Sequence, residues 1–191
     1  MLDSTYWNNR YLSNETGWDI GHASPAIIEF FADKDKDAKI LIPGCGNAYE
    51  GEVLHRQGFK NITLADFAEE TKTNFLNRYE HFEPNQFHVG DFFELNGTFD
   101  YIVEQTFFCA LAPSLREKYV FKMKELLHVE GKLVGLMFDA PMHIDHPPFG
   151  GSKEDYLALF GDHFGAVRIE KCQNSIPPRA GKELWIEIGH S

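Results

Sequence analysis

Short apolar runs alternate along this chain with longer stretches in which apolar residues recur at the spacing of a helix. A buried parallel strand is apolar along its length, whereas an amphipathic helix is apolar on one side, so the pattern predicts alternating strands and helices. The predicted strands run from residue 40 to a glycine turn at 44–46 and over 61–65, 86–89, 99–103, 132–138, 167–172 and 184–188. The predicted helices cover 4–13, 48–57, 68–82, 113–128 and 152–163, and another begins at Ser24 and Pro25.

This order of elements predicts an α/β fold in which a mostly parallel sheet carries helices on both faces. No helical pattern separates the last two apolar runs, so we expect the C-terminal strands to pair antiparallel as a hairpin. The 191 residues are 43% hydrophobic and 14% aromatic, which suits one domain with a full core. We therefore take residues 1–191 as a single domain.

The turn after the first strand contains two glycines. Gly44 and Gly46 supply the backbone freedom that a sharp turn needs, and they let a ligand approach closely. A helix is expected directly after the turn and should end at Gly58. About 20 positions beyond the turn, Asp66 closes the second strand, and an acid at this spacing accepts hydrogen bonds from ribose hydroxyls in nucleotide-binding α/β folds. Turn and acid together predict a cofactor that contains adenosine.

The residue at position 49 narrows the choice of cofactor. A dinucleotide-binding turn has a third glycine where Tyr49 stands, because its helix N-terminus faces a pyrophosphate. A bulky ring there disfavours NAD and FAD, and with them a nicotinamide-dependent oxidoreductase. S-adenosylmethionine has a ribose but no phosphate, so the turn and the acid suffice for it.

Composition and charge limit the partners. The formal net charge is −11 and there is no basic stripe to neutralise phosphates, so nucleic acid is disfavoured. No stretch approaches the roughly 20 apolar residues of a membrane helix, and the N-terminus lacks signal-peptide features, so we expect a cytoplasmic protein with no membrane partner. The three widely spaced cysteines, Cys45, Cys109 and Cys172, suit reduced thiols. A small molecule is the expected partner, and the oligomeric state stays open.

Open α/β sheets bind ligands beyond the carboxyl ends of their strands. The polar and aromatic residues at these positions are Asp66, Asp91, Phe92, Glu104, Gln105 and Asp139. A sulfonium ligand with an amino group and ribose hydroxyls would supply partners for acids gathered there. Asp139 fits a loop cap as well as a ligand contact. His143 and His146 precede Pro147 and Pro148, so a helix that presents both imidazoles to a metal is not expected.

Several longer segments are similar to those of one enzyme family. They are Trp-Asn-Asn-Arg-Tyr at 7–11, Gly-Trp-Asp-Ile-Gly at 17–21, Ile-Pro-Gly-Cys-Gly-Asn at 42–47, Thr-Phe-Phe-Cys-Ala-Leu at 106–111 and Ile-Pro-Pro-Arg-Ala-Gly-Lys-Glu at 176–183. Through them the chain resembles the thiopurine methyltransferase superfamily nearly end to end, and most of all its branch of halide, thiocyanate and thiol methyltransferases. The resemblance implies a class I, Rossmann-like methyltransferase fold and S-adenosylmethionine as the cofactor.

The resemblance also implies which residues bind this cofactor. Aromatic rings at Trp7, Tyr11 and Trp18 would lie over it, and such rings attract a sulfonium by roughly 0.5 to 2 kcal/mol. We expect residues 4–22 to form the lid that carries them. Gly44 would lie near the methionine part, Asp66 at the ribose, and Asp91 and Phe92 at the adenine. Gly46 and Gln105 are also expected to bind the cofactor, although many relatives have tyrosine at position 105.

Methyl transfer from a sulfonium to a soft anion is an in-line displacement that needs placement more than it needs a base. Holding the nucleophile on axis lowers the barrier by roughly 7 to 11 kcal/mol, and a dry aromatic site adds to this effect. The chain has no convincing set of nucleophile, base and orienting residue, which agrees with direct transfer. The predicted function is therefore methylation of a halide, thiocyanate, bisulfide or thiol.

Acceptor contacts are expected from Arg179, Phe149, Phe107 and Arg10. Phe149 stands where relatives often have tyrosine, so a hydroxyl that could help to deprotonate a thiol is missing and an apolar surface suited to polarisable anions remains. Two other functions stay open. One is S-methylation of larger organic or aromatic thiols such as thiopurines, and the other is a non-enzymatic role as an adaptor that binds S-adenosylmethionine.

Overall fold

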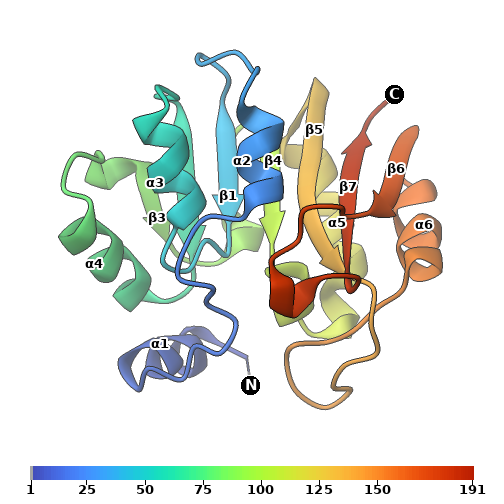
Figure 1. Cartoon of the computed structure of the whole chain (residues 1–191), viewed down its shortest axis with the longest axis horizontal. Coiled ribbons are helices and arrows are strands. Elements are labelled where there is room, and N and C mark those ends of the chain that lie inside the picture. The colour runs from blue at the N-terminus through green and yellow to red at the C-terminus, as the bar shows by residue number, and fades with distance from the viewer. Residues whose placement is uncertain (1) are drawn as a thin grey trace.

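The computed structural model describes residues 2–191, which form a seven-stranded sheet in the order β3-β2-β1-β4-β5-β7-β6 (Figure 1). The strands that pair parallel are β1 (Ile40–Pro43), β2 (Ile62–Asp66), β3 (Phe87–Val89), β4 (Phe99–Gln105) and β5 (Leu127–Phe138). β7 (Glu183–Gly189) pairs antiparallel with β5 and with β6 (Ala166–Lys171). The predicted mostly parallel sheet with a C-terminal antiparallel strand is confirmed.

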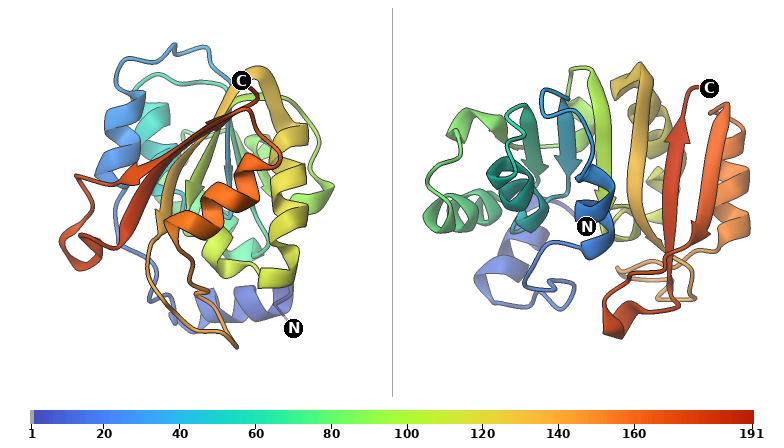
Figure 2. Two further views of the ribbon diagram at one scale, coloured as in Figure 1. Left: turned by 90° about the vertical axis from the view of Figure 1, so that its right-hand side faces the viewer. Right: turned by 45° about the horizontal axis from the view of Figure 1, so that its top comes forward.

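Helices cover both faces of this sheet (Figures 1 and 2). On one face lie α2 (Pro25–Phe31), α3 (Tyr49–Arg56) and α4 (Glu69–Arg78), and on the other lie α5 (Arg116–Leu126) and α6 (Lys153–Gly161). Each face has its own core. The first buries Phe31, Leu54 and Phe75, and the second buries Tyr119 and Phe160. No helix within residues 2–191 is long and apolar enough to cross a membrane.

Local sequence sets the ends of several helices. α2 begins at Pro25 directly after Ser24, as predicted, although the Ser24 side chain makes no capping hydrogen bond. Gly58, with φ of +97°, follows the end of α3, where a left-handed residue stops a helix. α6 begins with a capping box, in which Ser152 and Asp155 each bond the backbone of the other.

Two predicted helices are shorter than their sequence patterns. In the range 113–128, Pro113–Leu115 form a 3-10 helix, η4, before α5, and α5 ends because Leu127 is already extended. β5 therefore begins at Leu127 and not at residue 132, since residues 128–130 are exposed and give no apolar run. The helix predicted over 68–82 ends at Arg78, because Tyr79 leaves helical geometry with φ −136° and ψ 77°.

Several connecting segments gather at the edge of the sheet where the parallel strands end (Figure 1). α1 (Ser4–Leu12) crosses this edge next to α4, and η3 (Phe108–Ala110) follows β4 there. The loop of residues 139–152 after β5 and the loop between β6 and β7, with η5 (Pro177–Arg179), reach the same edge. Ligands of α/β sheets bind at this edge.

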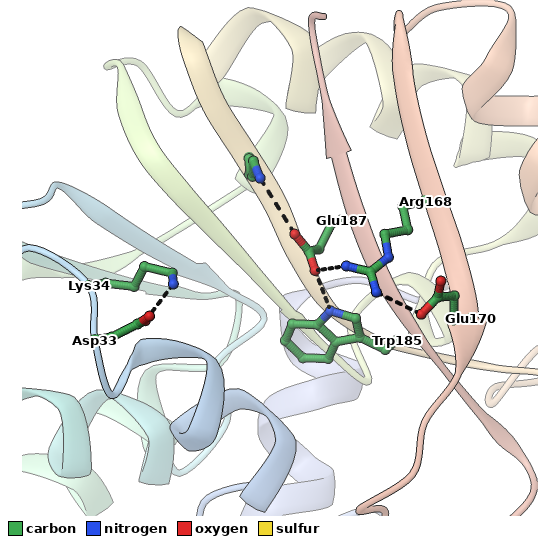
Figure 3. A network of polar contacts seen from close by, with 7 residues as sticks. Asp33, Lys34, Arg168, Glu170, Trp185 and Glu187 are labelled. Atoms are coloured by element: carbon green, nitrogen blue, oxygen red, sulfur yellow. Dashed lines mark hydrogen bonds and ion pairs between the residues drawn. The ribbon is translucent and has the colours of Figure 1, made fainter.

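The outer strands carry a charged network on the face of the sheet that bears α2 (Figure 3). Glu187 accepts hydrogen bonds from Arg168 and from the Trp185 indole, each at 3.1 Å, and Arg168 also pairs with Glu170 at 2.8 Å. Charges along an edge strand oppose its pairing with a second sheet. This part of the surface is therefore a solvated face, and the candidate site lies elsewhere.

Candidate active site

The glycine turn after β1 is in contact with two side chains from distant parts of the chain. Gly44 and Gly46 have φ of +57° and +53°, in the left-handed region that favours glycine. A Cβ on Gly44 would lie 2.3 Å from the Phe107 ring, and a Cβ on Gly46 would lie 2.8 Å from the Tyr11 hydroxyl. Glycine is therefore needed for the backbone and for these contacts, which bring predicted cofactor and acceptor residues together.

Asp66 lies at the end of β2 and is bonded to the glycine turn. Its Oδ2 accepts a hydrogen bond from the Gly46 N–H at 2.8 Å, and its Oδ1 accepts one from the Ala68 N–H at 2.9 Å. Burial raises the pKa of the carboxyl group, although the backbone donors act in the opposite direction. The spacing seen in the sequence is thus a direct contact between acid and turn. Binding of ribose by Asp66 stays a prediction.

Trp7, Tyr11 and Trp18 form the aromatic cluster of the N-terminal segment. The Trp18 ring packs edge-on against the others, with its centroid 5.5 Å from that of Trp7 and 5.7 Å from that of Tyr11. The Trp18 Nε1–H donates to the Tyr11 hydroxyl at 3.3 Å. Burial, together with the negative charge of Asp66, raises the pKa of Tyr11, so its hydroxyl stays neutral. The structure brings these three rings together beside the glycine turn.

Polar contacts fix the N-terminal segment to the body of the protein. The Oδ2 atom of Asp19 accepts hydrogen bonds from Asn47 at 2.5 Å and from the Tyr49 hydroxyl at 3.3 Å. The Asn8 side chain accepts one from the Glu70 N–H, near the start of α4, at 2.9 Å. Tyr49, which argued against a dinucleotide, therefore also holds the segment beside the turn.

The ends of β3 and β4 carry three more predicted residues. Asp91 accepts a hydrogen bond from the Phe93 N–H at 2.9 Å and so starts the 3-10 helix η2 (Phe92–Glu94). Phe92 is buried, with its ring centroid 5.1 Å from that of Phe107, so it supports the Phe107 ring. The Oε1 atom of Gln105 is buried and has no hydrogen-bond partner within residues 2–191. An acceptor without a donor at this edge is available to a ligand.

Phe67 was not predicted as a site residue. It directly follows Asp66 and remains 37% exposed, whereas Phe75 in the next helix and Phe87 in the next strand are buried. An exposed aromatic ring beside the glycine turn offers a flat apolar surface to a base. Its position immediately after Asp66 was the one feature of the sequence that could have identified Phe67 as a site residue.

Glu104 was named at a strand end but was not assigned a role. Its Oε1 accepts hydrogen bonds from the N–H groups of Phe107 and Phe108 at 2.8 Å each, and its Oε2 accepts one from the Tyr119 hydroxyl at 2.5 Å. Burial raises the pKa of Glu104 from 4.5 to about 7, and the three donors offset this effect only in part. Because these donors come from a turn and a helix that the sequence pattern does not bring together, the role could not be predicted from the sequence.

A cavity of about 510 Å³ opens between η4, the 139–152 loop and α6. Met142, Ile144 and Phe149 line it with apolar surface, and Arg116 and His143 line it with polar groups. One Arg116 N–H donates to the Gly150 carbonyl at 2.7 Å, whereas its Nε atom is buried with no hydrogen-bond partner within residues 2–191. Arg116 was not predicted from the sequence, since one arginine at a helix start has no distinguishing pattern.

Phe149 connects this cavity with the glycine turn. The Phe149 N–H donates to the Cys109 carbonyl at 2.7 Å, and Cys109 belongs to the same short turn as Phe107. The Phe149 side chain is buried at the cavity wall, as the predicted apolar surface requires. The structure therefore joins Phe149 and Phe107 through one turn, and their contact with an acceptor stays a prediction.

Arg179 and Arg10, the predicted cationic residues, already have partners. Arg179 donates to the Trp18 carbonyl at 2.7 Å and pairs with the buried Glu183 at 3.3 Å. Arg10 donates to the Glu15 carbonyl at 3.0 Å, and its guanidinium lies 5.4 Å from the centroid of the Trp18 ring. A guanidinium has five N–H donors, so these contacts leave others free. Contact of either arginine with an acceptor stays a prediction.

Asp139 and the two histidines belong to the 139–152 loop. Asp139 accepts a hydrogen bond from the Lys153 N–H at 3.3 Å and so supports the start of α6, which is the capping role that the sequence left open. His143 and His146 stack on the exposed loop, with ring centroids 3.9 Å apart. Within residues 2–191 no three His, Cys, Asp or Glu side chains are grouped so that they could hold a metal ion.

Relatives match this chain over nearly its whole length. The family model of Thiopurine S-methyltransferase (TPMT) matches residues 2–186. Thiocyanate methyltransferase 1 of Arabidopsis thaliana is 30% identical, over 93% of this chain and 81% of its own. A thiopurine S-methyltransferase of Vibrio parahaemolyticus is 24% identical, over 96% of this chain and 94% of its own.

Solved structures share the fold at lower identity. A TehB-like SAM-dependent methyltransferase from Corynebacterium glutamicum has a TM-score of 0.70 at 18% identity, over 98% of both chains. Magnesium protoporphyrin IX methyltransferase from Synechocystis, with bound SAM, has a TM-score of 0.75 at 12% identity, over 98% of this chain and 95% of its own. The predicted class I fold and the predicted cofactor are confirmed. The chain belongs to the thiopurine S-methyltransferase family and is an S-adenosylmethionine-dependent methyltransferase.

Proposed function

We propose that the protein transfers a methyl group from S-adenosylmethionine to a small soft nucleophile: a halide, thiocyanate, bisulfide or a simple thiol. The observation that carries this proposal is the cavity beside Phe149, where the apolar surface of Met142 and Ile144 accompanies Arg116, whose Nε atom has no hydrogen-bond partner among the described residues. One cation, together with apolar surface that replaces the hydration water, suits the binding of a polarisable anion. The names of two plant relatives, a thiocyanate methyltransferase and a probable thiol methyltransferase, support this acceptor class.

The residues at the glycine turn fit the cofactor. Its amino group and ribose hydroxyls are donors, and the buried Oε1 atom of Gln105 is an acceptor without a donor in the part of the chain that the structure describes. Each carboxylate oxygen of Asp66 accepts one backbone hydrogen bond and retains capacity for a ribose hydroxyl. We assign the exposed Phe67 ring to the adenine, and the rings of Tyr11 and Trp18 to the sulfonium.

The remaining predicted residues have supporting places in this proposal. We assign Gly44 and Gly46 to the methionine part of the cofactor, because their turn is in contact with Phe107 and Tyr11, two residues of the proposed acceptor and cofactor sites. Asp91 stays a candidate at the adenine, and Phe92 supports that side from behind Phe107. Trp7 completes the aromatic cluster through its contact with Trp18.

When bound, S-adenosylmethionine supplies an electrophilic methyl group. The protein has to hold both reactants on one axis and to exclude water from them. In our proposal the N-terminal segment covers the cofactor, and the bonds of Asp19 to Asn47 and of Arg179 to Trp18 keep it closed. A halide or thiocyanate already has a free lone pair, so no side chain has to accept a proton during the transfer.

Turnover of labelled S-adenosylmethionine against iodide, bromide, thiocyanate, bisulfide and simple thiols tests the acceptor class. We expect a methylated product from at least one small anion. Replacing Arg116 by methionine should lower kcat/KM for that anion by about tenfold or more, because the charged hydrogen bond is lost, while cofactor affinity stays the same. Lys118→Met, on the same helix, is the matched control. Equal kcat/KM in the Arg116 variant and the wild type would contradict the assignment of the cavity.

A larger organic thiol is a second candidate, favoured by the size of the cavity. Its volume of about 510 Å³ lies within the roughly 300 to 1,000 Å³ of small-molecule sites and exceeds what a single anion fills. A thiopurine S-methyltransferase among the relatives supports this alternative. Turnover of an aromatic thiol, with none of the halides or thiocyanate, would replace the first proposal by the second.

A further inference from the structure

Glu104 differs from the proposed site residues because it points into the protein. It is only 1% exposed, and every partner of its carboxyl group lies in the turn after β4 or on α5. The titratable groups near it are Tyr119 on α5, Cys109 in η3 and Tyr156 on α6, and β5 places Gly135 opposite it. None of these neighbours carries a positive charge, so hydrogen bonds alone balance the carboxylate.

These hydrogen bonds fix the backbone that carries the Phe107 ring. The ring lies against Gly44, and its centroid is 5.1 Å from that of Phe92 and 6.0 Å from that of Tyr119. Thr106, immediately before it, has φ of +58°, which a β-branched residue rarely adopts. A strained turn of this kind persists when its surroundings hold it, and here Glu104 bonds the next two N–H groups.

We propose that Glu104 is a positioning residue of the cofactor site: it holds the turn of residues 106–109 and so fixes the Phe107 ring in its packing against Gly44. Glu104 touches neither the cofactor nor the acceptor. The inference rests on the proposed function only in placing the cofactor at the glycine turn. It adds a residue to the site that acts through Phe107.

The protonation state of Glu104 should therefore affect binding. The ionised carboxylate accepts all three hydrogen bonds, whereas a protonated carboxyl group uses one oxygen as a donor and loses the charge assistance of the others. Because burial raises the pKa of Glu104 to about 7, this change falls in the neutral range. Asp66 is the other buried acid at the turn, and burial raises its pKa as well. We expect cofactor affinity to rise with pH through neutrality.

Calorimetry with S-adenosylhomocysteine as the probe, between about pH 6 and about pH 8, tests this expectation. Wild-type affinity should rise by about tenfold, since hydrogen bonds to a charged group are stronger than neutral ones by that order. Glu104→Gln keeps an acceptor for Phe107 and Phe108 but cannot ionise, so its affinity should be constant and lower than that of the wild type at the higher pH. A pH step that persists unchanged in Glu104→Gln belongs to another group and would overturn the proposal.

Tyr119→Phe separates positioning from mere structural support. The Tyr119 hydroxyl donates a hydrogen bond to Glu104, and this bond lowers the pKa of Glu104. Removing the hydroxyl should therefore move the midpoint of the affinity profile to higher pH, by about half a pH unit or more. The matched control is Tyr79→Phe, which loses a buried tyrosine hydroxyl bonded to His55 in the other core. If Glu104 had only a structural role, Tyr119→Phe would weaken binding but would not shift the pH midpoint of the affinity profile. An unmoved midpoint in Tyr119→Phe would therefore contradict the proposal.

Asp66→Asn distinguishes this inference from the proposed cofactor site. Unchanged affinity for S-adenosylhomocysteine in a folded Asp66→Asn variant would show that the cofactor lies elsewhere. Weakened binding in that variant, together with a Glu104→Gln variant that follows the wild type at every pH, would remove the Glu104 inference alone. Circular dichroism establishes folding, and if Glu104→Gln does not fold, the direction of the Tyr119→Phe shift decides.

Discussion

At the scale of single residues, Asp66 has a structural task and a proposed binding task. Its carboxylate holds the Gly46 and Ala68 N–H groups, and in our proposal it also accepts the ribose hydroxyls. Asp66→Asn retains the size and one acceptor oxygen, but it loses the charge and one of the two backbone hydrogen bonds. We expect a folded protein whose affinity for S-adenosylhomocysteine is weaker by about 1.5 to 3 kcal/mol, measured by calorimetry.

Asp100 provides the matched control for Asp66→Asn, because it lies far from the glycine turn in the sequence. Asp100 accepts a hydrogen bond from the Lys39 N–H at 2.8 Å, near the start of β1, while the glycine turn follows the end of that strand. Asp100→Asn should bind the cofactor product as the wild type does. An equal loss of affinity in both variants would show that the effect comes from general destabilisation and not from the ribose contact.

Glu104 also makes the stability of the fold depend on pH. Its pKa in the folded protein is about 7, above the 4.5 of the free side chain, so the folded state binds the proton more tightly. The stabilisation is complete below about pH 4.5 and is lost as the pH rises to about 7. Glu104→Gln should therefore unfold at a similar temperature near pH 5 and be more stable near pH 8, by up to roughly 3 kcal/mol.

Thermal unfolding across this pH range, with Glu187→Gln as a control, measures the effect. Glu187 is part of the charged network on β7, where it pairs with Arg168 and Lys132, so its replacement should change stability by the same amount at both pH values. Parallel curves for Glu104→Gln and the wild type would contradict a raised pKa. A glutamate that costs stability at neutral pH but supports the site is a compromise that functional residues often show.

At the scale of elements, local patterns could be predicted and contacts between distant segments could not. The glycine turn, the acid at the end of β2 and the stop at Gly58 each follow from a few neighbouring residues, and the structure has all three. The start of β5 was missed because exposed residues occupy its first positions. The role of Glu104 depends on burial and on a helix that begins 12 positions later, which no local pattern encodes.

The N-terminal segment is an element whose mobility can be measured. Residues 4–22 contain the aromatic cluster and are docked through Asp19 and Trp18. We expect amide exchange over 4–22 to slow by about tenfold or more when S-adenosylhomocysteine binds, because the cofactor adds contacts beneath the rings. Exchange within β5 should not change. Complete protection without ligand would make the segment a fixed wall.

Asp19→Ala tests whether docking and binding are coupled. It removes the hydrogen bonds to Asn47 and Tyr49, so exchange over 4–22 should be faster without ligand, and affinity for S-adenosylhomocysteine should fall. Asp3→Ala is the control, because Asp3 caps α1 through the Tyr6 N–H without contacting the glycine turn. Equal affinities in the two variants would show that docking of the segment does not contribute to binding.

At the scale of the whole molecule, the alternation of strands and helices was sufficient to predict the class of fold, because parallel strands need crossover helices that cover both faces. The order of strands and the cavity beside Phe149 were not predicted, since both depend on how distant loops pack at one edge of the sheet. The proposed transfer at this edge of the sheet assigns no side chain as a base. The pH dependence of the rate tests that feature directly.

If the acceptor is a preformed soft anion, the rate of its methylation at saturating cofactor should be independent of pH, because the anion needs only placement and desolvation. Among the halides this rate should fall in the order iodide, bromide, chloride. A thiol must first lose its proton, and Phe149 has no hydroxyl to assist, so the thiol rate should rise with the ionisation of the acceptor, near pH 8.5 for a cysteine-like thiol. Saturating cofactor removes the contribution that Glu104 makes to affinity. Initial rates for iodide and a thiol are measured in parallel. The same midpoint for both acceptors would mean that a group of the enzyme titrates during transfer, and a base such as His22 or His146 would replace direct displacement in the mechanism.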